Sequence, residues 1–168
     1  MTTDRPKSVS MLRFNFAFWL VEITAAGAAG LYTLKTGNEP PITSTPIMII
    51  AIGLALLWYG KAVNRPMTGL EISKFSIGNM VADLINGVAW MIAMILVLDV
   101  PFSWEGVSIA LGGEVSGHSA KIAVLIGLIV GEGGVAITSA FFAWLISRKL
   151  PKPISAAEKF NAAGRNDV

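Results

Sequence analysis

The sequence predicts an all-α integral membrane protein, with four transmembrane helices in an antiparallel bundle and both termini in the cytoplasm. The mean hydropathy is +0.64, and 14% of the 168 residues are charged, whereas soluble domains carry about 25% charged residues. Four apolar stretches approach or exceed the length of about 20 residues that a spanning helix needs. A soluble four-helix bundle would need a polar face on every helix, and residues 47–57 offer none.

The first span is predicted at about 12–34, after a cytoplasmic N-terminal segment at 1–11. A cleaved signal peptide is the rival interpretation, because the small residues at 26–30 would suit a cleavage site. Glu22 interrupts the apolar core, however, and the stretch is longer than the about 7–15 residues of a signal-peptide core. We therefore expect a membrane-spanning helix.

The second span is predicted at about 42–60 and is the shortest of the four. Pro46 would lie in its first turn, where the missing N–H of proline costs nothing, and Ser44 or Thr45 would cap it. The third and fourth spans are predicted at about 77–98 and 122–146, within a transmembrane domain that covers 12–147.

An outer loop at 99–120 joins the third and fourth spans, and within it residues 102–111 are predicted to form a short helix on the membrane surface. The glycine-rich segment 112–119 has the look of a phosphate-binding loop. His118 stands where such a loop has its lysine, however, and no strand precedes the segment. We therefore expect no nucleotide site there.

The distribution of basic residues predicts the orientation. Lys and Arg concentrate in the cytoplasmic segments that flank membrane spans. Eleven of the 13 basic residues lie before the first span, between the second and third, or in a basic cytoplasmic tail at 148–168, and only Lys35 and Lys121 lie on the other side. Both termini are therefore expected in the cytoplasm, and the chain in the cytoplasmic (inner) membrane of a bacterium or archaeon.

Three carboxylic acids inside the predicted spans are the main functional signal: Glu22, Asp83 and Glu132. A charged residue at the centre of a spanning helix costs about 2.5–3.5 kcal/mol on insertion scales, and no Lys or Arg is placed at the same depth. With a rise of about 1.5 Å per residue, the three lie roughly 12, 10 and 15–20 Å from the cytoplasmic boundary. We expect them to converge on one site slightly on the cytoplasmic side of the midplane.

Polar residues also recur at i, i+4 and i+7, so that two spans each turn one polar stripe inward. Three close acids in a low dielectric would not all stay ionised, so at least one would hold an exchangeable proton. Amide oxygens beside them would help to bind a cation. The sequence therefore predicts a proton- or cation-binding site. The stripes are Asn15, Trp19 and Glu22 on the first span and Asn79, Asp83 and Asn86 on the third.

Three glycines of the fourth span, Gly127, Gly131 and Gly134, share one helical face. Small residues allow another helix to approach closely in a membrane, so this face is predicted to be a helix-packing interface. Because four helices make a narrow bundle, we expect a homo-oligomer or partner membrane subunits in addition to the lipid bilayer.

Composition removes several other classes of function. The chain has no cysteine and one histidine, His118, which lies outside the spans. Thiolate chemistry and a haem held by two histidines are therefore excluded, and we expect no metal site and no cofactor. The basic sequence pI of about 9.0 reflects the membrane-flanking residues, so no nucleic-acid partner is expected. No nucleophile–base pair marks catalytic residues.

Two functions of different classes are left. The first is a proton- or cation-coupled transporter or ion-conducting protein that uses the intramembrane carboxylates. The second is a non-catalytic accessory subunit of a larger membrane complex of the respiratory or oxidoreductase type, in which the polar stripes would meet those of a partner. A membrane-embedded enzyme is third, since two apposed acids can perform acid–base chemistry.

Overall fold

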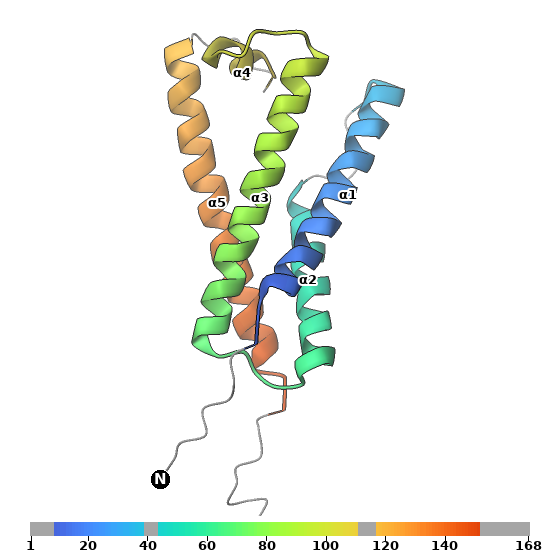
Figure 1. Cartoon of the computed structure of the whole chain (residues 1–168), viewed down its shortest axis with the longest axis vertical. Coiled ribbons are helices and arrows are strands. Elements are labelled where there is room, and N and C mark those ends of the chain that lie inside the picture. Colours follow the sequence, from blue (N-terminus) through green and yellow to red (C-terminus); the bar gives the residue numbers. More distant parts are fainter. Residues whose placement is uncertain (1–8, 39–43, 111–116, 152–168) are drawn as a thin grey trace, which may run out of the picture.

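The computed structural model describes residues 9–38, 44–110 and 117–151, which are helical apart from short turns (Figure 1). Four of the helices are each long and apolar enough to cross a membrane, which confirms the predicted all-α class with four candidate spans. The helices are α1 (Leu12–Thr36), α2 (Ser44–Val63), α3 (Gly69–Val97), the short α4 (Trp104–Ala110) and α5 (Gly117–Ser147).

The long helices form a bundle in which α1 packs against α2 and α3, and α5 packs against α3 and α2. Successive long helices run in opposite directions, so the start of α1, the α2–α3 turn and the end of α5 lie together (Figure 1). We call this end, which holds residues 64–68, the base, and the opposite end the α4 end. Toward the α4 end α3 and α5 diverge, and α4 lies between them (Figure 1).

The hydrophobic core lies in the half of the bundle nearer the base. Its largest buried side chains include Phe14 and Phe18 of α1, Tyr59 of α2 and Phe75 of α3. The ring of Phe14 meets those of Trp58 and Tyr59 edge to face, each with 5.3 Å between centroids, a geometry that aromatic quadrupoles favour. The base half is therefore the tightly packed part of the chain.

Toward the α4 end the long helices expose most of their apolar surface. In a membrane such side chains face lipid tails or another protein, because lipid is as apolar as they are. Exposed large side chains in this half include Leu31, Trp90, Leu96, Ile129 and Val130.

The structure corrects the predicted start of the third span, since α3 begins at Gly69 rather than at residue 77. A capping box starts the helix. The Thr68 hydroxyl accepts a hydrogen bond from the Glu71 N–H at 3.3 Å, and a Glu71 carboxylate oxygen accepts one from the Thr68 N–H at 2.8 Å, so two N–H groups at the helix start are satisfied. The charged Glu71 and Lys74 lower the hydropathy of this first part of α3, so the apolar pattern did not include it.

Other predicted boundaries differ at the α4 end. The short helix in the outer loop is confirmed as α4, but α5 begins at Gly117. His118 therefore lies in a helix, and the prediction of a loop up to residue 120 is wrong there. The predicted helix start at 42–43, most of the N-terminal segment and the tail after residue 151 lie outside the described residues.

Candidate functional site

Glu22 of α1 meets the polar stripe of α3. Its side chain is 7% exposed, and one carboxylate oxygen accepts a hydrogen bond from the Asn86 amide at 3.4 Å. The Asp83 carboxyl lies within hydrogen-bonding reach of the Glu22 carboxyl. Two carboxyl groups in such contact need a proton between them, since two bare carboxylates repel. The structure thus brings together two predicted acids and one predicted amide.

Glu132 reaches the same level from α5. It lies within electrostatic range of both Glu22 and Asp83, and among the described residues no basic side chain acts on any of the three. In the part of the chain that the structure describes, one buried oxygen of Glu132 and the amide oxygen of Asn86 have no hydrogen-bond partner. We call these four residues, Glu22, Asp83, Asn86 and Glu132, the acid layer.

The acid layer is not a ready-made metal site. Within the described ranges, no three His, Cys, Asp or Glu side chains come close enough together to hold a metal ion. Glu22 and Asp83 interact through their side chains, whereas Glu132 acts on them by electrostatics alone. Buried polar atoms without a protein partner usually bind water.

Asn79, predicted with the acids, lies in a second polar layer nearer the base. Its amide oxygen accepts a hydrogen bond from the Asn15 amide at 2.7 Å, and its own amide donates to the Ser139 hydroxyl at 3.1 Å. Asn15 also donates to the Phe75 carbonyl at 2.8 Å. Asn79 and Ser139 are fully buried. We call Asn15, Asn79 and Ser139 the amide layer; it ties α1, α3 and α5 together.

The two layers have the same spacing on all three helices. Glu22 follows Asn15 by seven residues, Asn86 follows Asn79 by seven, and Glu132 precedes Ser139 by seven on the antiparallel α5. Seven residues of α-helix are two turns, so the layers are about 10 Å apart. Ser139 was not identified from the sequence as a polar contact of Asn79. Its spacing of seven residues from Glu132 could have indicated that both lie on one face of α5.

The predicted glycine interface is open within the chain. A side chain added at Gly127, Gly131 or Gly134 would meet no atom within 4 Å, so no described helix packs on this face. The close approaches occur elsewhere. An added Cβ at Gly78 of α3 would lie 2.5 Å from the Asn15 side chain, and one at Gly30 of α1 would overlap the Trp90 ring.

A buried ion pair at the base is the second polar feature that the sequence did not reveal. The Arg65 guanidinium donates to both oxygens of Glu71, at 2.7 and 2.9 Å, and this bidentate contact raises the pKa of Arg65 above its usual value. Glu71 is fully buried and also accepts from the Val9 N–H at 2.8 Å and the Tyr59 hydroxyl at 3.4 Å. We call Tyr59, Arg65, Thr68 and Glu71 the base clamp.

The base clamp joins the segment before α1 to α2, the α2–α3 turn and α3. The turn is in addition held to α5, because the Met67 N–H donates to the Ser147 hydroxyl at 3.0 Å. All four long helices are therefore fixed to one another at this end.

Comparison with models of protein families, with curated protein sequences and with solved structures finds no match to this chain. The two polar layers inside the candidate spans are therefore the features of the described chain that bear on its function.

Proposed function

We propose that this chain is a small polytopic membrane protein that binds protons, or a cation in competition with them, at the acid layer and moves them across the membrane. One observation carries the proposal. Carboxyl groups of α1 and α3 lie close enough to interact inside candidate membrane spans, a third from α5 is within electrostatic range, and no basic side chain of the described chain neutralises them.

A charged side chain is energetically costly in the interior of a membrane. Ionisable residues inside membrane helices usually pair with an opposite charge or mark an ion pathway. Without a basic partner, acids this close retain at least one proton, or bind a cation in its place. The unpartnered oxygens of Asn86 and Glu132 would supply further ligands for a hydronium ion or a cation.

The proposed orientation has the base on the cytoplasmic side. Lys61, Arg65, Arg148 and Lys149 lie near the base, and Lys35 and Lys121 lie at the α4 end. The positive-inside rule favours the more basic side for the cytoplasm. Both termini would then be cytoplasmic, in the inner membrane of a bacterium or archaeon.

Proton flux through the reconstituted protein tests the proposal. The purified protein is placed in liposomes that contain a pH-sensitive dye, and a potassium diffusion potential drives proton entry. We expect flux above that of empty liposomes, and we expect Asp83→Asn and Glu22→Gln to reduce it to the empty level. Glu105→Gln removes a carboxylate from the exposed surface of α4 and should leave the flux unchanged.

Flux that Asp83→Asn and Glu22→Gln leave unaltered would remove the acid layer from the mechanism. A wild-type protein without flux under a proton gradient, or under a sodium or potassium gradient, would refute the transport proposal altogether.

The open face of α5 favours a second candidate, an accessory subunit of a larger membrane complex. Gly127, Gly131 and Gly134 offer a surface on which a helix of another subunit can pack, and the acid layer would then serve the partner's proton path. Purification from native membranes in mild detergent separates the two candidates. Stoichiometric recovery of larger subunits would favour the subunit role, whereas recovery of this chain alone would favour the transporter.

A further inference from the structure

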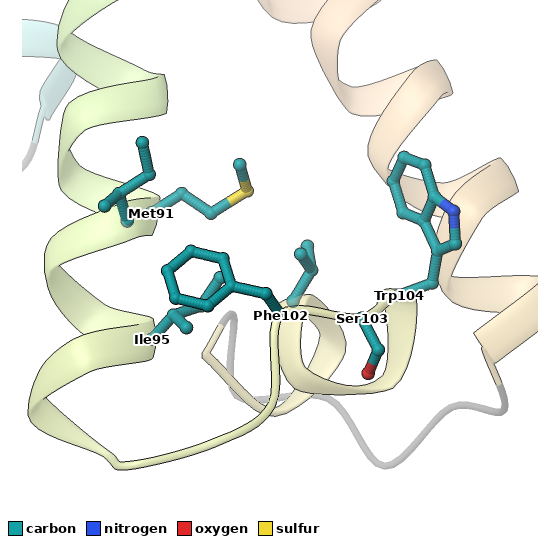
Figure 2. A pocket seen from close by; sticks show the side chains of 7 residues that line it. Met91, Ile95, Phe102, Ser103 and Trp104 are labelled. Carbon is teal, nitrogen blue, oxygen red and sulfur yellow. The ribbon is translucent and has the colours of Figure 1, made fainter.

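An apolar pocket lies between α3 and α4, at the edge of the membrane-spanning region. Met91, Ile92 and Ile95 of α3 line one wall, and Phe102, Trp104 and Val107 line the other, as seen from close by in Figure 2. Its volume is about 340 Å³, within the range of about 300–1,000 Å³ that is usual for small-molecule sites. The pocket is thus large enough for part of a ligand.

The surface of this pocket is suited to a hydrocarbon chain. Ser103 is the one polar residue in the lining, and its hydroxyl already accepts a hydrogen bond from the Gly106 N–H at 3.2 Å. Phe102, whose ring lies beside Ile95 of α3 in Figure 2, is 71% exposed. Exposing a phenylalanine side chain to lipid tails costs little free energy, whereas exposing it to water is unfavourable.

A positive charge stands at the rim of the pocket. The Lys121 ammonium lies 6.0 Å from the centre of the Trp104 ring, and the candidate span of α5 begins at Lys121. Tryptophan and lysine are typical of the boundary between lipid tails and headgroups. The cation therefore lies beside one of the aromatic residues that line the pocket, at the start of a candidate span.

We propose that this pocket binds one acyl chain of an anionic phospholipid whose phosphate is held by Lys121. The arrangement matches both parts of such a lipid, an apolar tail in the hollow and a negative headgroup at the adjacent ammonium. A neutral lipid would gain the apolar contact without the attraction to the charge of Lys121. This site is independent of the acid layer.

Quenching of Trp104 by brominated lipids tests the assignment. The protein is reconstituted with increasing fractions of brominated phosphatidylglycerol or brominated phosphatidylcholine in unlabelled phosphatidylcholine. The Trp104 signal is the difference between the unmodified protein and Trp104→Phe, and circular dichroism checks that both are equally helical. Bromine quenches only at contact distance, so quenching reports a lipid tail beside Trp104.

We expect the anionic lipid to quench Trp104 at a membrane fraction about fivefold lower than the neutral lipid, since one basic side chain at a membrane surface has an effect of about this size. Lys121→Gln should abolish the difference. Lys35→Gln removes a charge at the same end of the bundle, from α1, and should preserve it. Equal quenching by both lipids, or a preference that survives Lys121→Gln, would overturn the proposal. Absence of quenching would also overturn it, because the pocket would then be covered by something other than lipid, such as a second copy of the chain.

Discussion

The base clamp makes a strong prediction about stability, which Glu71→Gln tests. The carboxylate of Glu71 is fully buried and accepts two hydrogen bonds from Arg65 and one each from the Val9 and Thr68 N–H groups. The substitution preserves the shape of the side chain but removes its charge, and the introduced amide can accept at only one of its two positions. The guanidinium of Arg65, whose side chain is 15% exposed, would lose its counter-charge.

Breaking a buried ion pair costs about 3–5 kcal/mol. Because Arg65 keeps some contact with water, we expect a loss of about 3 kcal/mol in the free energy of unfolding. The assay is unfolding of the purified protein in mild detergent by added SDS, followed by far-UV circular dichroism. Glu105→Gln, on the exposed surface of α4, is the matched control and should change stability by no more than about 0.5 kcal/mol.

Replacing Arg65 by methionine in the Glu71→Gln variant separates the charge from the hydrogen bonds. This double variant leaves no orphaned charge and keeps the glutamine oxygen as an acceptor for the Val9 or the Thr68 N–H group, so it should be more stable than Glu71→Gln alone. If Glu71→Gln unfolds at the same SDS concentration as Glu105→Gln, the base clamp does not hold the four helices together and the reasoning fails.

Further predictions concern the contact between α1 and α3 and use the same unfolding assay. Gly78→Ala should lower the free energy of unfolding by about 1–3 kcal/mol, because its Cβ would lie 2.5 Å from Asn15. Gly87→Ala, in the same helix but with nothing within 4 Å, should be neutral or stabilising by up to about 1 kcal/mol. Equal effects of the two would mean that α1 does not approach α3 closely at Gly78. Asn79→Ala should cost about 2 kcal/mol, because the buried Asn15 amide loses its acceptor. A loss of less than about 1 kcal/mol for Asn79→Ala would mean that the amide layer adds little.

The sequence was sufficient for the helices and for part of the acid layer. Long apolar runs identify spanning helices because lipid offers the backbone no hydrogen bonds. The spacing of Glu22 relative to Asn15, and of Asp83 and Asn86 relative to Asn79, determined which faces would turn inward. The contact between Glu22 and the α3 stripe followed from those two faces.

Other features depend on which helices become neighbours, and this information is not local. Ser139 is a single hydroxyl in an apolar span, and its role appears only when Asn79 lies opposite. Glu71 lies before the predicted start of the third span, and its role appears only when Arg65 lies beside it. The glycine face of α5 could not be placed from spacing alone, because a small-residue face packs equally well inside a chain or against another molecule.

The two polar layers also restrict how the helices can move. The residues of the two layers are seven positions apart on α1, α3 and α5, so an axial displacement of α5 by one turn would separate Ser139 from Asn79 and break their hydrogen bond. The two layers come into register again after two turns, about 10 Å, where Glu132 would lie at the level of Asn79. The two layers therefore oppose an axial displacement of α5 relative to α3, because such a displacement separates their polar partners.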